Sequence, residues 1–342
     1  MNRIIFFFAF IGIIVMSCTT SPSYHEDDKE GLRMFLRQPS AKNSKLNAEQ
    51  LGLAISDTLD WQNSEKWVRK INGLVWNNES PKRLIEISAK NRFDFRNFNE
   101  GWSKRNLAGN LDASKWSKLT TLKCDGNQLT ALDVSANTEL DFLLCSWNQL
   151  TALDVNSNRA LTVLYCSNNQ LTELDLSKNT ALTDLYCFHN QLIVLDVSSN
   201  TALTNLNCSD NQLAELIVRA TNTALTWVRC SNNRLPISNL LAVSERITDP
   251  YYKELGAQNL LPKTIKINNE IDFSSQNIFK GIYTKFAVIK DENPENTDDY
   301  TITDGKITFH TLSNYTLTMT NEAIKSSEEY PAKVIIKIEV VD

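Results

Sequence analysis

Residues 161–181 read LTVLYCSNNQLTELDLSKNTA, and the same 21-residue pattern recurs along the middle of the chain. Full copies begin at Leu119, Leu140, Leu161, Leu182 and Leu203, and a partial sixth copy begins at Leu225. A degenerate half-copy, NLAGNLDASKWSK, precedes them over 106–118. Self-similarity at a fixed period of this length is typical of a solenoid, in which each coil packs only on its neighbours.

Each copy opens on LxxLxC and continues as xxNxL, a pattern that resembles the leucine-rich repeat. In that repeat the residues around the second Leu form a short strand, and successive strands lie about 4.8 Å apart. Side chains alternate across a strand, so Leu122 and Cys124 are predicted in the core and Lys123 faces outward. We therefore predict an α/β repeat solenoid over 98–236, with short parallel strands and a mostly irregular convex side.

Asparagine is abundant, with 37 residues in the chain, and the repeat explains this excess. The ninth position is always asparagine, at Asn127, Asn148, Asn169, Asn190, Asn211 and Asn233. An asparagine amide offers donors and an acceptor, so a stacked column can satisfy the buried backbone groups where successive coils turn. We interpret two further columns as structural for the same reason. They are Asn137, Asn158, Asn179 and Asn200, and, on the convex side, Asp133, Asp154, Asp175 and Asp196.

The cysteines also follow the repeat, because six of the 7 occupy the same inward position of successive copies. They are Cys124, Cys145, Cys166, Cys187, Cys208 and Cys230. Parallel side chains on strands about 4.8 Å apart keep their Cβ atoms further apart than the ~3.8 Å that a disulfide prefers. We expect free thiols that act as small core residues. A metal or redox ladder is disfavoured, since no histidine or CxxC motif accompanies them.

The N-terminus has the pattern of an export signal. An apolar run from Ile4 to Met16 is shorter than the ~20 residues that span a bilayer, so residues 1–17 are predicted to be a signal peptide. The sequence Val-Met-Ser-Cys that ends at Cys18 resembles a bacterial lipobox, which implies that Cys18 is acylated. An ordinary secretory signal is the alternative. Residues 18–30 are predicted to be a lipidated, disordered tether.

Both ends of the solenoid need covering. Residues 31–97 are predicted to be an N-terminal capping region, with helices over 47–59 and 64–74 and a strand pair around an Asn/Ser/Pro turn. After the repeats, 237–262 are predicted to form a capping helix and linker. Alternating strands over 263–342 predict an all-β, immunoglobulin-like sandwich. Its acidic stretch 291–299 fits no EF-hand spacing, so a solvated loop is favoured over a calcium site.

Several features together resemble the leucine-rich repeat lipoproteins of Bacteroides-type bacteria. They are Cys18 with its acidic tether, the repeats, and a tail that contains YTITDGKITF (300–309) and NYTLTMTN (314–321). The order of repeats and immunoglobulin-like module also resembles the internalins in architecture. The resemblance implies an exported binding protein, which we expect in the outer membrane and on the cell surface, and it names no ligand.

Composition excludes several classes of function. The formal net charge is −5 and the chain has no Lys/Arg block, which argues against binding to nucleic acid. There are only 3 histidines, and no nucleophile elbow, P-loop, zinc motif or dinucleotide-binding fingerprint is present. We therefore expect no enzyme activity, no cofactor and no metal. Membrane contact is expected through the lipid anchor only, and the protein is expected to be a monomer.

Aromatic side chains gather at outward positions of the repeats, where core packing does not explain them. The candidate partner-binding residues are Phe142, Trp147, Tyr165, Tyr186, Phe188, His189, Trp227 and Arg229. The leading hypothesis is a non-catalytic adhesion or interaction module that recognises a protein through the concave face of the solenoid. The alternative is a surface accessory lipoprotein that binds glycans with the same aromatic patch. A purely structural envelope protein without a ligand also stays open.

Overall fold

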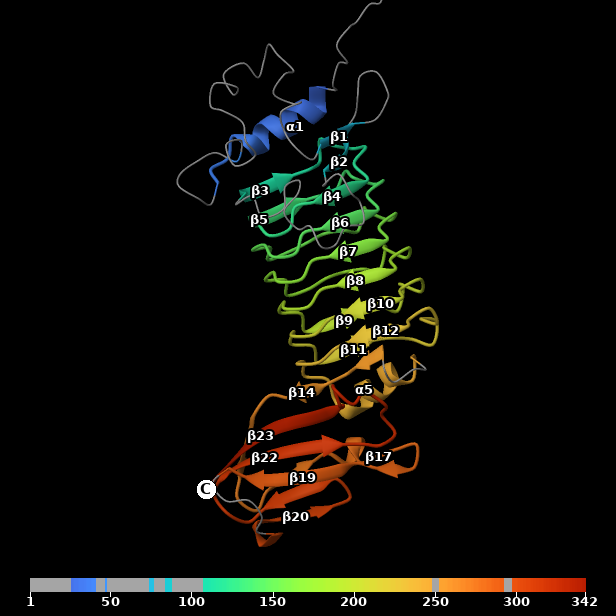
Figure 1. The fold of residues 1–342 in the computed structure, drawn as a ribbon. Coiled ribbons are helices and arrows are strands. Elements are labelled where there is room, and N and C mark those ends of the chain that lie inside the picture. The colour runs from blue at the N-terminus through green and yellow to red at the C-terminus, as the bar shows by residue number, and fades with distance from the viewer. Residues whose placement is uncertain are drawn as a thin grey trace, which may run out of the picture.

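The computed structural model describes residues 26–40, 47, 74–76, 84–87, 107–247, 252–291 and 297–342. A stack of short strands leads into a β-rich module at the C-terminal end (Figure 1). The predicted signal peptide over 1–17, Cys18 and nearly all of the helices predicted over 47–59 and 64–74 lie outside the described residues. In the part of the chain that is described, no helix is long and apolar enough to cross a bilayer.

One nine-stranded sheet runs the length of the solenoid, in the order β1-β2-β4-β6-β7-β8-β10-β12-β13. Its strands are β1 (Leu74–Trp76), β2 (Leu84–Ile87), β4 (Thr121–Lys123), β6 (Phe142–Leu144), β7 (Val163–Tyr165), β8 (Asp184–Tyr186), β10 (Asn205–Asn207), β12 (Trp227–Arg229) and β13 (Lys253–Glu254). All neighbours from β2 onward are parallel, and Leu143, Leu164 and Leu185 stand opposite one another in register. The predicted parallel-strand solenoid is thus confirmed. The strand pair expected before it is present as the antiparallel β1 and β2.

The opposite flank of the coils carries two short parallel ladders. One pairs β3 (Ala108–Asp112) with β5 (Gln128–Asp133), and the other pairs β9 (Val194–Asp196) with β11 (Glu215–Ile217). The aspartate column lies along this flank, where each carboxylate accepts a hydrogen bond from the backbone amide two residues later. Asp175 Oδ1 accepts one from Ser177 at 2.9 Å, and this bond lowers the pKa of Asp175.

The interior of each coil is filled by leucine and cysteine. Leu143, Leu164 and Leu185 are fully buried, and all six repeat cysteines are buried free thiols. Burial raises the pKa of Cys166 and of Cys230 to about 12. Because the thiolate is the reactive form, these cysteines are inert packing residues at neutral pH.

The asparagines at the ninth position form a continuous hydrogen-bonded column through the stack. Asn169 Nδ2 donates to the carbonyl oxygens of Cys145 at 3.1 Å and Cys166 at 3.0 Å. Its Oδ1 accepts from the Leu150 amide at 3.0 Å. The Cys166 carbonyl also accepts from Asn190 of the next coil at 3.1 Å. Each amide therefore joins its own coil to the one before and provides hydrogen-bond partners for backbone groups at the turn.

A second column repeats this device at the other turn of the coil. Asn158 Nδ2 donates to the Val134 carbonyl at 2.9 Å and to the Asn137 carbonyl at 2.8 Å, both in the preceding coil. Asn179 and Asn200 make the same two bonds one and two coils further along. The coil is thus fastened at two separate turns.

The N-terminal end is covered by helix α1 (Glu26–Leu36). The sequence predicts a disordered tether as far as residue 30, and this is wrong for residues 26–30, which form the first half of α1. Acidic residues in the first turn complement the helix dipole, and Leu32 and Phe35 are buried on the solenoid end. Trp116 of the degenerate half-copy is fully buried, and its Nε1 donates to the Asp28 carbonyl at 3.2 Å.

The C-terminal end differs from the prediction as well. Helix α5 (Ile237–Ser244) occupies the position of the predicted capping helix. Within the predicted linker, residues 253–259 instead continue the solenoid as part of a seventh coil, because β13 pairs in parallel with β12. Gln258 takes the place of the column asparagine: its Nε2 donates to the carbonyls of Cys230 at 3.0 Å and Leu255 at 2.7 Å. The coil packs so closely that a Cβ on Gly256 would lie 2.4 Å from the Ser231 Cβ.

The β-rich module contains a five-stranded sheet of β14 (Ala257–Asn259), β23 (Lys333–Val341), β22 (Asn314–Thr320), β19 (Lys285–Lys290) and β15 (Lys263–Lys266). A three-stranded sheet is made of β16 (Glu270–Asp272), β21 (Lys306–Phe309) and β20 (Tyr300–Thr303), and a hairpin of β17 (Ile278–Phe279) and β18 (Ile282–Tyr283). Strands β14 and β15 run parallel to β23, while its other neighbour is antiparallel. The module is therefore all-β with a mixed sheet, and an immunoglobulin-like topology stays a prediction.

The column predicts a specific loss of stability. Replacing Asn169 by alanine removes the acceptor of the buried Leu150 amide, so we expect Asn169→Ala to lower the free energy of unfolding by about 2 kcal/mol. Gln170→Ala is the matched control, since Gln170 is exposed and should change stability by less than about 0.5 kcal/mol. Urea unfolding followed by circular dichroism measures both. Equal midpoints for the two variants would contradict a role of the column in stability.

Candidate functional site

Four aromatic rings line up on the outer face of the nine-stranded sheet, and we call Phe142, Tyr165, Tyr186 and Trp227 the aromatic strip. Tyr165 and Tyr186 stand opposite each other on β7 and β8, with ring centroids 4.5 Å apart. Strand β10 carries no aromatic residue, and the rings of Tyr186 and Trp227 approach to 5.9 Å with a nearly parallel orientation of 26°. The strip therefore extends over five coils, from β6 to β12, and four of these coils contribute a ring.

The two ends of the strip differ in exposure. Tyr165, Tyr186 and Trp227 are half-buried. Phe142 was expected to face solvent, and this is wrong, since only 6% of it is exposed. Its ring lies 5.4 Å from the Lys123 Nζ and 6.5 Å from the Tyr165 ring. Phe142 therefore supports the strip from one end and is not itself a contact residue.

Polar groups beside the strip are already engaged within the chain. The Asp184 carboxylate accepts hydrogen bonds from Asn205 Nδ2 at 2.8 Å and from Thr183 Oγ1 at 2.7 Å. Burial, with the nearby Asp184 carboxylate as a smaller cause, raises the pKa of Tyr186. Burial raises that of Tyr165 as well, so both phenols stay neutral throughout the physiological range. The strip is thus an apolar, uncharged surface with hydroxyl groups at its edge.

The turn that follows each strand puts one residue per coil in the left-handed region. Asn168, His189 and Asp210 have φ of 55°, 51° and 55°, and Gly126 has 65°. Glycine adopts this region readily, and asparagine, aspartate and histidine adopt it more often than other residues, whereas it is rare for a bulky side chain. Trp147 occupies the same position with φ 57° and 63% of its surface exposed. An exposed tryptophan is therefore held where the backbone favours glycine or asparagine.

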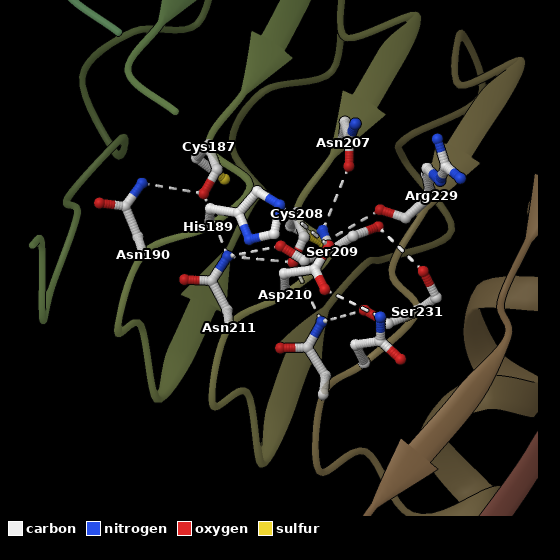
Figure 2. A network of polar contacts seen from close by, with 12 residues as sticks. Cys187, His189, Asn190, Asn207, Cys208, Ser209, Asp210, Asn211, Arg229 and Ser231 are labelled. Atoms are coloured by element: carbon white, nitrogen blue, oxygen red, sulfur yellow. Dashed lines mark hydrogen bonds and ion pairs between the residues drawn. The ribbon is translucent and has the colours of Figure 1, made fainter. Parts of the chain in front are cut away.

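Phe188 and His189 form a separate group at this turn. Their rings meet edge to face with centroids 5.5 Å apart, and His189 Nε2 lies 3.8 Å from Asp210 Oδ2. Figure 2 shows His189 and Asp210 to the right of the column asparagines Asn190 and Asn211. The hydroxyl groups of Ser209 and Ser231 lie 3.3 Å apart. Within the described residues, no three His, Cys, Asp or Glu side chains are grouped to hold a metal ion.

Arg229, a predicted partner-binding residue, is engaged by the C-terminal module. Its Nε lies 2.8 Å from Glu254 Oε2, and its guanidinium carbon lies 4.7 Å from the centre of the Tyr330 ring. These contacts fix Arg229 within the chain, so it serves the junction between solenoid and module. The sequence offered no sign of this, because Tyr330 lies far outside the repeats.

A groove lies at this junction, with a volume of about 740 Å³. We call it the junction groove, and it is lined by Trp227, Tyr252, Glu254, Lys325, Ser326, Ser327, Glu328, Glu329 and Tyr330. Trp227 belongs both to the groove and to the aromatic strip. Sequence reasoning missed the other lining residues. The one available signal was the match of KELGAQNLLP (253–262) to the start of a further coil.

The left-handed backbone conformation of Trp147 predicts that tryptophan at this position lowers the stability of the fold. Asparagine tolerates φ 57°, so we expect Trp147→Asn to raise the free energy of unfolding by about 1 kcal/mol. Trp147→Ala is the matched control, because alanine removes the ring but keeps the Cβ that disfavours this conformation, and its gain should be smaller. Thermal unfolding of the three proteins measures the effect. A clear loss of stability in both variants would show that the ring packs on the coil.

No protein-family model matches the chain, and no curated protein matches it. Similar solved structures are internalin-like leucine-rich repeat proteins of Listeria monocytogenes. The functional domain of InlJ, described as including a cysteine ladder, is 21% identical over 68% of this chain and 78% of its own, with a TM-score of 0.30. InlP is 19% identical over 68% and 70%, with a TM-score of 0.42. The internalin-like protein lmo2027 is 14% identical over 93% and 96%, with a TM-score of 0.41. At these identities and TM-scores the likeness does not extend to a function.

Proposed function

We propose that this protein is a non-catalytic, lipid-anchored binding protein of the cell envelope that recognises a protein partner through the outer face of the nine-stranded sheet. The observation that carries the proposal is the aromatic strip. Tyr165, Tyr186 and Trp227 are large rings held in a row, half-exposed, on a backbone fastened at every coil. Rigid aromatic side chains supply contact area at a low cost in conformational entropy, and they dominate protein interfaces for that reason.

The arrangement of the rings favours a protein over a glycan at the strip. The centroids of neighbouring rings lie 4.5 and 5.9 Å apart, so the rings form one continuous apolar cluster. A sugar instead stacks on the free face of a separate ring, with polar side chains beside it. The half-buried strip with its neighbouring hydroxyl and amide groups resembles the apolar centre and polar rim of an interface.

A glycan remains the second candidate because of Trp147. This single ring is 63% exposed and lies in the turn after β6, at the position that Asn168 occupies in the next coil. Strained backbone at an exposed aromatic is a feature that proteins retain at binding sites. Glycan binding at Trp147 would leave the strip free, so the two functions are separable by substitution.

Capture experiments test the strip. The immobilised full chain should retain a defined set of proteins from host-cell surface and bacterial envelope extracts, identified by quantitative mass spectrometry. The double variant Tyr165→Ala/Tyr186→Ala should lose this set, because it removes the centre of the patch. The matched control is Ile193→Ser/Val194→Ser, which changes two exposed apolar residues on the opposite flank and should retain the set.

Thermal unfolding and circular dichroism must show that both double variants are folded. Identical capture by all three proteins would contradict recognition through the strip. Binding to immobilised oligosaccharides that Trp147→Ala abolishes would favour the glycan function instead.

The lipid anchor and the cell-surface location are tested together. Cys18→Ala should move the protein from the membrane fraction to the soluble fraction, because the acylated residue is removed. Protease added to intact cells should degrade the wild-type protein. An unchanged membrane fraction would contradict lipidation at Cys18, and protection until the outer membrane is opened would contradict surface display.

A further inference from the structure

The junction groove continues the aromatic strip beyond the last strand of the repeats. Trp227 stacks on Tyr186 at 5.9 Å on one side and lines the groove on the other. The remaining walls come from Tyr252 and Glu254 and from residues 325–330 of the C-terminal module. A partner that lies along the strip therefore meets the groove at the end of its path. The C-terminal module then contributes to recognition as well as covering the solenoid end.

The chemistry of the groove is that of a site for a cation. The chain's own Arg229 shows this, since its guanidinium lies 4.7 Å from the Tyr330 ring centre and its Nε lies 2.8 Å from the Glu254 carboxylate. Both partners belong to the groove wall. An aromatic face combined with a carboxylate is the environment that stabilises a guanidinium or ammonium group.

The rest of the groove is also lined by aromatic rings and carboxylates. Trp227 is half-buried and 46% of Tyr252 is exposed, and both border the groove. Glu328 and Glu329 are exposed at its rim. The charged groups at the groove are three carboxylates against two cations, Lys325 and Arg229. The balance is therefore acidic, and one of the two cations is already paired with Glu254.

We propose that the junction groove receives a lysine or arginine side chain from a basic segment of the protein partner, with Trp227 and Tyr252 as its aromatic contacts and Glu328 and Glu329 as its counter-charges. The volume of about 740 Å³ accommodates a long side chain together with its backbone. This inference rests on the proposed function, because it extends the same surface and shares Trp227 with it.

The test uses short peptides as probes and the Trp227 ring as reporter. The full chain is labelled with 5-fluorotryptophan, and the Trp227 fluorine resonance is identified with Trp227→Phe. The probe is acetyl-Gly-Lys-Gly-Lys-Gly-amide, and its uncharged match has norleucine in place of lysine. We expect the lysine peptide to shift the Trp227 resonance saturably and the norleucine peptide to leave it unchanged. Added salt should weaken the binding, because the counter-charges are exposed.

Variants then locate the counter-charges. Glu328→Gln/Glu329→Gln should weaken the lysine peptide about fivefold, which is the loss of two exposed charge contacts. The matched control is Glu173→Gln/Glu215→Gln, which makes the same change in net charge at exposed positions away from the groove and should leave the affinity unchanged. Equal weakening by both double variants would overturn the proposal, because only overall charge would then matter.

Other outcomes also decide the question. Equal shifts by both peptides, or no saturable shift, would overturn the cation site. A shift caused by cellohexaose and by neither peptide would show a glycan groove, which also overturns it. The cation-site proposal and the proposed function can fail independently. Partner capture is therefore measured both with the wild-type chain and with Glu328→Gln/Glu329→Gln. Undiminished capture by Glu328→Gln/Glu329→Gln would overturn the groove proposal and leave the proposed function of the strip intact.

Discussion

The stacked carboxamide column is the interaction on which the structure depends. A coil of 21 residues cannot bury its own hydrophobic face or satisfy its own turns, so it is stable only against a neighbour. Each asparagine amide joins two coils, and each cysteine carbonyl between them accepts from two successive amides, as the Cys166 carbonyl does from Asn169 and Asn190. The column passes through six asparagines and ends on Gln258, whose longer amide makes the equivalent bonds to the last coils. Its continuity gives the solenoid a single register.

Because the register is fixed, equivalent positions of successive coils form rows along the solenoid, both in its interior and on its surface. The inward row holds the cysteines, whose burial keeps the thiols protonated and inert. The outward row brings Tyr165 and Tyr186 to 4.5 Å. The left-handed turn places Trp147 in a row with asparagine, histidine and aspartate, which tolerate that conformation. A residue that differs in type from the equivalent residues of the other coils is therefore a candidate for a role outside packing and turn formation. Trp147 is the clearest example.

The two ends of the solenoid are covered by segments that do not follow the repeat. Helix α1 buries Leu32 and Phe35 against a degenerate half-copy, although its first residues look like part of a polar tether. The C-terminal module enters as a seventh coil and holds Arg229 through Glu254 and Tyr330. Two of the eight candidate binding residues differ from the expectation of an outward contact residue. Phe142 is buried beside Lys123 and Tyr165 of the neighbouring coils, and Arg229 is held by Glu254 and Tyr330, which lie outside the repeats.

The sequence by itself determined the solenoid, the inward cysteines and the positions of the asparagine columns, because in a repeat every defining contact recurs once in each period. It also located the aromatic rings on one face, since alternation along a strand decides which way Tyr165 and Tyr186 point. Only the tertiary structure decided which of those side chains stay accessible, and it alone assembled the junction groove from Trp227, Tyr252 and Tyr330. Those residues meet through contacts that are distant in sequence and occur once, and a pattern cannot reveal a contact that it does not repeat.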